Sequence, residues 1–470
     1  MGTRVLKPKM KTSHKHLSSF RDPSGYIFVD EDIVYRRINA SYFDKFTKLY
    51  DSGLYDKLAQ ARDLITHEIG EHNDSYLIIK PEQLGLITYP YEWSFSQIKD
   101  AALLTLRVHL SALDHDMILK DATAFNVQFH NGKPIFIDTL SFDFYHDGDP
   151  WVAYGQFCRH FLAPLLLMKY IAPDLNKLQV SYLDGVPLET ASRMLPLKTH
   201  FSPFIKTNIH MHAKAFAKHK DTFETDKKPH LAKKTHYNII TNMMHYIQAL
   251  KLTSETEWGD YYAITNYDEG SFKFKEETIK TWIAQFDLKK IWDIGGNDGH
   301  FSRLVQDSCD TIVCSDVDPV AVDTNYRTVK KNNEQNIIPL VIDFINPPPG
   351  IGFGNEERSA FKDRVRNLKI DCIMALALIH HLSISANCTF EMLADMFTQH
   401  SDMLLIEFVA PGDSWAEKLL RSKRGARNLF AFYNKENFEA VFGRYYEFMD
   451  VKDIPNSQRS LYMMARRKQA

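Results

Sequence analysis

The sequence predicts an α/β domain with a doubly wound parallel sheet at the C-terminus, preceded by an N-terminal α+β domain. Two observations lead to this expectation. From about residue 255 onward, five short apolar runs alternate with amphipathic segments, the pattern of parallel strands covered by helices on both faces. Between about 195 and 250 the chain is instead rich in Lys and His and poor in acidic residues. A chain this long favours more than one domain, so we expect an α+β domain at 1–195, a helical connector at 196–254 and the α/β domain at 255–470.

The composition is that of an ordinary globular protein. Of the 470 residues, 44% are hydrophobic and 13% are aromatic, and the formal net charge of −2 gives no reason to expect nucleic-acid binding. No apolar stretch follows the basic N-terminus, and the most apolar run, at 161–172, is too short for a bilayer and predicts a buried helix. Five cysteines without a CxxC pair predict buried free thiols. We expect a cytoplasmic protein without a transmembrane segment; its oligomeric state stays open.

The Lys/His-rich connector has two interpretations. It is either a solvated, partly helical link or a basic surface for an anionic substrate or lipid headgroup. His210 and His212 have no second pair at the spacing of zinc ligands, so we expect no metal there.

The five apolar runs are expected to be the strands of the parallel sheet. Ligands of such sheets bind at the carboxyl ends of the strands, so the residues that end each run are the candidates for binding. In chain order the runs are "KKIWDIGG" (289–296), "DTIVCSDVDP" (310–319), "NIIPLVIDF" (336–344), "IDCIMALAL" (370–378) and "DMLLIEFV" (402–409).

The first run leads into a glycine turn, "IWDIGGNDGHFSRLV" (291–305). An apolar strand, a glycine turn and a helix start together predict a ligand held closely against the backbone. The turn is neither the GxGxxG of a nicotinamide site nor a Walker loop, which needs GKS or GKT. The candidate binding residues of the turn are Asp293, Gly295, Gly296, Asn297 and Gly299.

Carboxylates stand at the ends of the next two runs. The second run ends in "CSDVDP", where Asp316, followed by Val317, is placed to accept hydrogen bonds from two ribose hydroxyls. The third run ends in "VIDF", where Asp343 is placed to meet the exocyclic amine of an adenine.

These three strand ends together resemble the class I S-adenosylmethionine-dependent methyltransferases. The resemblance implies a Rossmann-like sheet that binds S-adenosyl-L-methionine, with the glycine turn at the methionine part, Asp316 at the ribose and Asp343 at the adenine. A sheet of this kind that no longer binds a cofactor is the alternative.

Longer blocks, among them "YPYEWSFSQIKDAALLTL", "LKDATAFNVQF" and "ALALIHHL", resemble a bacterial methyltransferase family that includes nodulation-associated proteins. This resemblance implies methyl transfer to an oxygen or nitrogen nucleophile of a small-molecule or glycan acceptor, which the sequence does not identify. A non-catalytic scaffold that binds S-adenosylmethionine is the alternative.

Three residues are candidates for contact with the acceptor. His380 and His381 follow the fourth run, where an imidazole can take a proton during transfer; the alternative is that one of them caps a helix or binds a buried carbonyl. Glu407, at the end of the fifth run, is the third candidate. The aromatic segment at 257–267 is expected either to cover the cofactor as a lid or to pack in a core.

The N-terminal part contains a second pattern, "LKDATAFNVQFHNGKPIFID" (119–138). Asp121 and Asn126 stand at D-x-x-x-x-N spacing, and a strand pair joined by an Asn-Gly turn ends at Asp138. The pattern resembles the catalytic loop and metal-binding aspartate of protein-kinase-like and aminoglycoside-phosphotransferase-like folds, which implies binding of Mg-ATP.

This part departs from the kinase pattern in three ways. Leu119 stands where a histidine is usual, "IDT" at 137–139 stands where DFG is common, and no GxGxxG phosphate loop is present. Three interpretations follow: a bifunctional kinase-methyltransferase, a kinase-like scaffold that presents the acceptor, or an unrelated α+β domain in which the Asp and Asn side chains shape turns.

Overall fold

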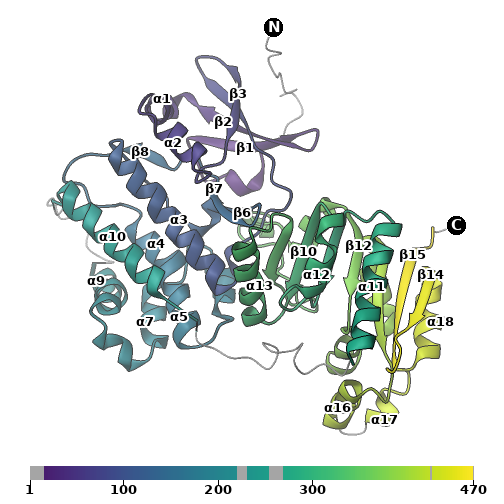
Figure 1. The fold of residues 1–470 in the computed structure, drawn as a ribbon. Helices are drawn as coiled ribbons and strands as arrows, with labels where there is room; N and C mark the ends of the chain where they lie inside the picture. Colours follow the sequence, from purple (N-terminus) through teal and green to yellow (C-terminus); the bar gives the residue numbers. More distant parts are fainter. Residues whose placement is uncertain (1–14, 220–229, 253–267, 424–425, 469–470) are drawn as a thin grey trace. The chain divides into compact units, whose positions relative to one another are not determined.

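The chain forms two compact units in a computed structural model that describes residues 15–219, 230–252, 268–423 and 426–468. The first unit comprises Met1–Ser254 and Gly350–Ser359, and the second comprises Glu255–Pro349 and Ala360–Ala470 (Figure 1). The segment expected as a connector at 196–254 is therefore part of the first unit. The aromatic segment at 257–267 lies outside the described residues.

The first unit begins with a four-stranded antiparallel sheet in the order β1-β2-β4-β3. A tight turn joins β1 to β2, and its residues Glu31 and Asp32 adopt positive φ angles of 48° and 64°. Two such residues are what a two-residue hairpin turn of matching twist requires. The strands are β1 (Gly25–Asp30), β2 (Ile33–Asn39), β3 (His67–His72) and β4 (Tyr76–Pro81), with α1 (Phe43–Asp51) and α2 (Leu54–Gln60) between β2 and β3.

A long buried helix, α3 (Phe95–Asp114), follows this sheet. It begins with a capping box, because the Ser94 side chain accepts from the Gln97 amide and the Gln97 side chain accepts from the Ser94 amide. The helix α10 (Lys233–Ala249) packs against α3. Because α10 comes from the Lys/His-rich segment, this segment contributes to the core of the first unit and is more than a solvated link.

Short strand pairs follow α3. The strands β6 (Val127–His130) and β7 (Lys133–Phe136) form the expected hairpin, with positive φ angles of 51° and 73° at Asn131 and Gly132. The strand β5 (Met117–Leu119) pairs with β8 (Phe142–Phe144). The strand ends therefore bring residues 119–126 and 137–141 together.

Helices complete the first unit. The apolar run at 161–172 is a buried helix as expected, since Leu165, Leu166 and Leu167 are fully buried. The helices are α4 (Tyr154–Phe157), the π-helix η5 (Cys158–Leu162), α5 (Ala163–Tyr170), α6 (Leu178–Ser181), α7 (Leu188–Met194), the 3-10 helix η7 (Leu197–Phe201), α8 (Pro203–Ile205), the π-helix η8 (Lys206–Met211) and α9 (His212–His219).

The second unit contains a seven-stranded sheet in the order β11-β10-β9-β12-β13-β15-β14. The five expected strands form its parallel part and are confirmed in position. The C-terminal strands add an antiparallel pair, with β15 next to β13. The strands are β9 (Lys290–Ile294), β10 (Thr311–Asp316), β11 (Ile337–Val341), β12 (Ile370–Ala375), β13 (Ser401–Val409), β14 (Tyr446–Asp453) and β15 (Arg459–Arg466).

Helices cover both faces of this sheet (Figure 1). In β9, Ile291 packs in a core cluster with residues of α11, α12 and α13, whereas the next residue, Trp292, contacts Phe361 of α14. Successive side chains thus enter separate cores, which explains the continuous apolar runs. The helices are α11 (Glu269–Gln285), α12 (His300–Val305), α13 (Pro319–Asn332), α14 (Phe361–Leu368), α15 (Phe390–Thr398), α16 (Ser414–Ser422), α17 (Ala426–Leu429) and α18 (Lys435–Tyr445).

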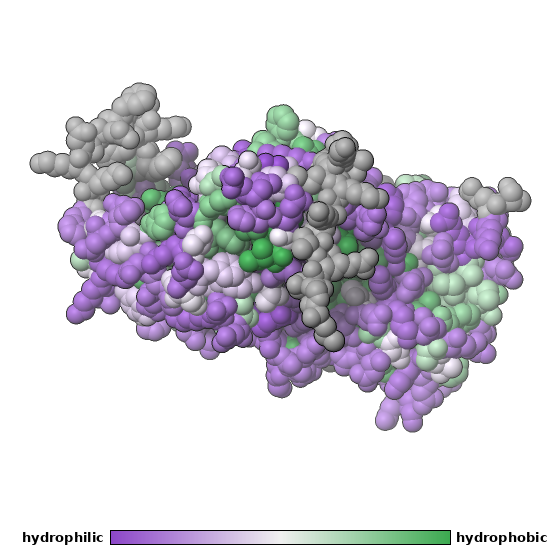
Figure 2. Space-filling view, turned by 90° about the horizontal axis from the view of Figure 1, so that it is seen from above, coloured by the Kyte–Doolittle hydropathy of each residue, from purple (hydrophilic) through white to green (hydrophobic). Residues whose placement is uncertain are grey.

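The cysteines are all free, as expected. Four of them are buried, and Cys388 is half-buried. Among the described helices, none has the length and apolar character needed to cross a membrane. Most of the surface in Figure 2 is hydrophilic, with small hydrophobic areas between the polar side chains.

Candidate functional site

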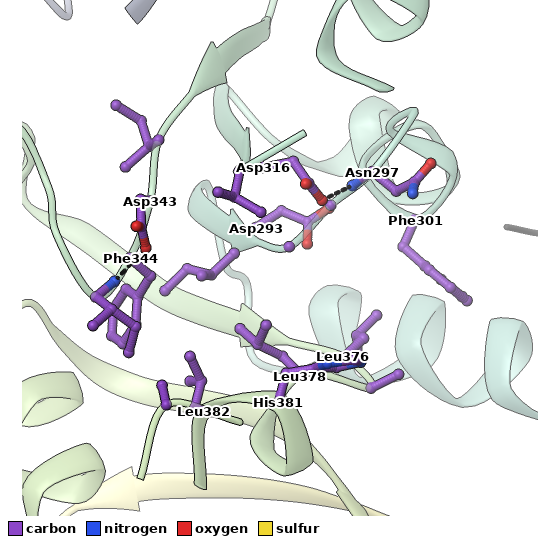
Figure 3. A pocket seen from close by; sticks show the side chains of 18 of the residues that line it. Asp293, Asn297, Phe301, Asp316, Asp343, Phe344, Leu376, Leu378, His381 and Leu382 are labelled. Carbon is purple, nitrogen blue, oxygen red and sulfur yellow. Dashed lines mark hydrogen bonds between the residues drawn. The ribbon is translucent and has the colours of Figure 1, made fainter. Parts of the chain in front are cut away.

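The second unit contains a cavity of about 270 Å³ at the carboxyl ends of β9, β10, β11 and β12. Residues from the ends of all four strands line it, together with two residues of α11, Phe272 and Lys275. Figure 3 shows Asp293 and Asp316 on one side of the cavity, and Leu378, His381 and Leu382 on the opposite side. Of the eight residues expected to bind a cofactor, seven line this cavity: Asp293, Gly295, Gly296, Asn297, Asp316, Val317 and Asp343.

The glycine turn is shaped by close contacts. A Cβ atom on Gly296 would lie 2.5 Å from Cys314 Sγ and 2.8 Å from Asp293 Oδ2, so this position has no room for a side chain. Asn297 adopts a positive φ of 50°, a conformation that asparagine tolerates better than most residues. The backbone of the turn can therefore come close to a ligand in the cavity.

Gly299 is the expected binding residue that does not line the cavity. It lies at the N-cap of α12 with a φ of 85°, and a Cβ atom there would meet Asn325 Oδ1 at 2.6 Å. Arg303 secures this end of the turn, since its guanidinium donates to Asn325 Oδ1 at 2.7 Å and pairs with Glu334 at 3.0 Å. Gly299 thus gives the turn its shape, whereas the residues at 295–297 line the cavity and can contact a ligand.

The side chain of Asp293 is buried, and that of Asp316 is half-buried. Burial raises the pKa of Asp293 to about 7, even though Ser302 Oγ donates to Asp293 Oδ2 at 2.7 Å. Burial also raises the pKa of Asp316 to about 6, against the stabilising effect of backbone amides, two of which donate to its carboxylate oxygens. These two amides belong to Asn297, at 2.9 Å from Oδ2, and Asp318, at 2.9 Å from Oδ1. The amide of Asn297, which belongs to the glycine turn, and the amide of Asp318 thereby fix the direction of the Asp316 carboxylate.

At the end of the third strand, β11, more of the residues that line the cavity are apolar. Asp343 Oδ1 accepts a hydrogen bond from the Ile345 amide at 2.9 Å, which orients its carboxylate. Phe344 and Ile345 line the cavity beside it, as does Leu378. Apolar side chains beside one hydrogen-bonding group suit a flat heteroaromatic ring.

A buried ion-pair network lies beneath the cavity. Lys275 Nζ is 2.6 Å from Glu407 Oε2, Arg459 Nη1 is 3.2 Å from Glu407 Oε1, and Arg459 Nε is 2.8 Å from Asp413 Oδ2. Burial lowers the pKa of Lys275, and the Glu407 carboxylate opposes this effect. Among the described residues that line the cavity, Lys275 is the sole lysine or arginine.

Two of the three residues expected to contact the acceptor do not line the cavity. Glu407 is fully buried, does not line the cavity and is held by two cations, so the structure gives it a role in positioning Lys275. His380 is 1% exposed and also absent from the cavity lining, and burial lowers its pKa well below the ordinary value. His381 does line the cavity, so of the three candidates it alone is placed to contact an acceptor.

In the first unit, the three residues of the kinase-like pattern come together. Burial raises the pKa of Asp121, and the nearby charge of Asp138 raises it further. A hydrogen bond from Asn126 lowers the same pKa. Arg36 Nη1 of β2 lies 2.5 Å from Asp138 Oδ1, and Ser141 Oγ donates to Oδ2. Burial alone would raise the pKa of Asp138, but Arg36, together with hydrogen bonds from Ser141 and the Leu140 amide, outweighs it and holds this pKa below its ordinary value. The carboxylate that would face a metal ion is thus already neutralised.

The comparison with curated proteins decides the family. The chain is 31% identical over 463 residues to nodulation protein NoeA of Rhizobium meliloti (strain 1021), and the alignment covers 95% of each protein. The chain belongs to the NoeA family. No family model matches it.

Solved structures similar to this NoeA-family chain include several methyltransferases. The N-methyltransferase NodS of Bradyrhizobium japonicum WM9 has a TM-score of 0.31 and 10% identity, covering 43% of this chain and 99% of NodS. Magnesium protoporphyrin IX methyltransferase (ChlM) of Synechocystis PCC 6803 with bound SAH has a TM-score of 0.31 and 12% identity, covering 45% and 92%. The bifunctional kinase-methyltransferase WbdD has a TM-score of 0.29 and 13% identity, covering 47% and 45%.

The sheet order of the second unit is itself informative about where a ligand binds. Numbered along the chain from β9, the order is 3-2-1-4-5-7-6 with the seventh strand antiparallel to the fifth. The order reverses between the first and fourth of these strands, β9 and β12, and the cavity lies at the carboxyl ends there, where open α/β sheets generally bind ligands.

Sequence reasoning missed Lys275 and Phe272, which line the cavity from α11. The available signal was a lysine within the apolar pattern "FKFKEETIKTWI", where a charged side chain on the buried face requires a partner.

Proposed function

We propose that the second unit binds S-adenosyl-L-methionine and transfers its methyl group to an acceptor. The observation that carries the proposal is the convergence of Asp293, Asp316 and Asp343, from three strand ends, on one cavity. The sulfonium of this cofactor is already activated, so the protein has to align the acceptor with the methyl group and remove a proton.

The cavity matches the cofactor group by group. Asp316 is placed to accept hydrogen bonds from the two ribose hydroxyls, and Asp343, beside Phe344 and Ile345, is placed to meet the amine of the adenine. The amino-acid end of the cofactor is a zwitterion. Asp293 and Lys275 offer it opposite charges in one cavity, and each side chain influences the pKa of the other. We assign the ammonium to Asp293 and the carboxylate to Lys275.

His381 is the proposed general base. It lies across the cavity from Asp293 and Asp316 (Figure 3), on the side left for the acceptor in this assignment. A neutral imidazole can take the proton that an oxygen or nitrogen nucleophile loses on methylation. We therefore propose a hydroxyl or amine acceptor carried by a small molecule or a glycan. A cytoplasmic location is proposed as well, because all five cysteines are free.

The test is calorimetric titration of S-adenosylmethionine and of SAH into the full chain. We expect affinity in the micromolar range, and a loss of about 2 kcal/mol or more in Asp316→Ala, which removes the charged acceptor of two hydrogen bonds. The matched control is Asp310→Ala, an exposed carboxylate before the same strand. Binding that is absent, or equal in Asp316→Ala, would contradict the proposal. Tight binding without transfer of labelled methyl to any acceptor would indicate a non-catalytic scaffold.

A second candidate function is binding of Mg-ATP by the first unit, in a bifunctional chain. It is favoured by one observation, the proximity of Asp121, Asn126 and Asp138. For a metal ion to bind, Arg36 must release Asp138. Magnesium-dependent binding of ATP that disappears in Asp138→Ala but persists in Asp143→Ala would support it. No heat at millimolar ATP would contradict it and leave the first unit as a scaffold.

A further inference from the structure

The first unit exposes two large apolar side chains on one short helix. Leu197 and Phe201, at the two ends of η7, are 81% and 87% exposed, higher than every other large apolar side chain among the described residues. Nearby, Met194 and Met211 are also exposed. Exposed apolar residues that gather in one place point to an interaction surface.

These side chains are held outward by ordered structure. Between Leu197 and Phe201, Thr199 is 2% exposed; its Oγ1 donates to the Pro196 carbonyl at 2.7 Å and lies 2.9 Å from His210 Nε2. The ring of His200 stacks on His210 of η8 at a centroid distance of 3.7 Å. The helix is therefore anchored through its inner side, and Leu197 and Phe201 cannot turn inward without breaking these contacts.

The same segment of the chain is rich in positive charge. From Thr190 to Lys220 the sequence contains no Asp or Glu. Exposed cations stand within five residues of the apolar pair in the chain: Arg193, Lys198 and Lys206. We call Leu197 and Phe201 with these three cations the basic–apolar tip.

We propose that the basic–apolar tip docks the protein on the surface of an anionic lipid bilayer. In this arrangement Leu197 and Phe201 enter the boundary between headgroups and acyl chains, and the three cations contact the negative headgroups. A protein partner is less well matched to the tip, because the cores of protein–protein interfaces are depleted of lysine, whereas here Lys198 lies between the two apolar residues. The proposal is independent of methyl transfer.

The test is co-sedimentation of the full chain with two kinds of vesicle, one of phosphatidylcholine and one of equal parts phosphatidylcholine and phosphatidylglycerol. We expect binding to the anionic vesicles, weakened by salt, and little binding to the neutral ones. The variant Leu197→Ser/Phe201→Ser should bind about tenfold more weakly, as should Lys198→Glu/Lys206→Glu.

The matched controls lie elsewhere on the first unit. Val152, which is 72% exposed, is changed in Val152→Ser, and the exposed Lys133 is changed in Lys133→Glu; both variants should bind like the wild type. Thermal unfolding of each variant shows whether it is folded. No binding to anionic vesicles, or equal binding by the tip variants and the controls, overturns the proposal. A concentration-dependent dimer that is lost in Leu197→Ser/Phe201→Ser, without vesicle binding, would also overturn it and assign the tip to a second copy of the chain.

Discussion

Lys275 Nζ lies 2.6 Å from Glu407 Oε2, and both side chains are buried where α11 meets the end of β13. The lysine reaches the cavity while the glutamate balances its charge from beneath. Arg459 holds the other oxygen of the same carboxylate at 3.2 Å. The pair therefore links the stability of the second unit to the charge that its cavity presents to a ligand.

Removal of the Glu407 carboxylate should make the second unit less stable. We expect Glu407→Ala to lower the free energy of unfolding by about 3–5 kcal/mol, because it leaves the charges of Lys275 and Arg459 buried without their shared partner. Denaturant titration measures the change. The control is Glu277→Ala, which breaks an exposed pair with Lys273 on α11 and should cost at most about 0.5 kcal/mol. Equal effects of the two variants would show that the buried pair is not a stabilising element.

Lys275 should strengthen the binding of ligands that carry a carboxylate, compared with ligands that lack one. We expect Lys275→Met to bind SAH at least about tenfold more weakly, since a charged hydrogen bond in a buried site is lost. Its affinity for 5′-methylthioadenosine, which lacks the amino-acid end, should change much less. Calorimetry with both ligands gives the comparison. The control is Lys273→Met, which changes an exposed lysine of the same helix, α11. An equal loss for both ligands would mean that Lys275 supports the cavity as a whole and does not bind the carboxylate.

Asp293 should make stability depend on pH. Its pKa is about 7 in the folded protein and near the ordinary value of 3.8 when unfolded, so the folded state binds the proton more tightly. The contribution of this group to stability is complete below the unfolded pKa and is lost as the pH rises through about 7. In Asp293→Asn this loss is absent, so the variant should gain about 2–4 kcal/mol relative to wild type between about pH 4 and about pH 8.

Chemical denaturation of both proteins across this pH range checks the Asp293 prediction. Saturating SAH should reduce the pH dependence of the wild type, because the proposed ammonium contact favours the ionised carboxylate. A constant difference between the two proteins at all pH values would show that Asp293 does not titrate in this range.

Gly296 should not tolerate a side chain. In Gly296→Ala the new Cβ would lie 2.5 Å from Cys314 Sγ, so the turn has to shift; we expect a cost of about 1–3 kcal/mol in stability and loss of SAH binding. The control is Gly270→Ala in the first turn of α11, where the Cβ would approach only Asp268 Oδ1, at 3.4 Å. Thermal unfolding and calorimetry are the measurements. Unchanged SAH affinity in Gly296→Ala would show that the turn does not touch the ligand.

The two adjacent histidines should differ in effect. His381→Asn should slow labelled methyl transfer by about 100-fold or more while SAH affinity stays within about twofold, as expected for a general base that does not hold the cofactor. His380→Asn should instead lower stability, because His380 is buried and lies outside the cavity lining. Single-turnover rates and unfolding curves separate the two effects. A slower rate in His380→Asn alone would reverse the assignment.

Features that depend on local pattern were predictable from the sequence. The five parallel strands and the glycine turn follow from apolar runs and from glycine spacing, which act over a few residues. Asp293, Asp316 and Asp343 could be placed in one cavity in advance, because the carboxyl ends of parallel strands meet at one edge of a sheet. The antiparallel pair β14 and β15 was not expected. The sequence of β14 is more polar than that of the central strands, and β15 begins and ends with an arginine.

The first unit shows where local pattern is insufficient. The segment 196–254 looked like a solvated link because it is rich in Lys and His, yet α10 packs on α3 and η7 is anchored to η8. These contacts decide which apolar residues of the segment face outward. The exposure of Leu197 and Phe201 therefore could not be predicted from the composition of the segment.

The sequence by itself determined the strands, the turn and the type of ligand that their ends can hold, because these follow from the short-range periodicity of the chain. The tertiary structure alone decided which charged groups near the cavity are available. Lys275, Glu407 and Arg459 are far apart in the chain, and only the packing of α11 and β15 around β13 brings them within 3.2 Å. Away from water, the role of a charged group depends on the partner that packing places beside it. For this reason Glu407, a candidate for contact with the acceptor, instead supports the charge of Lys275.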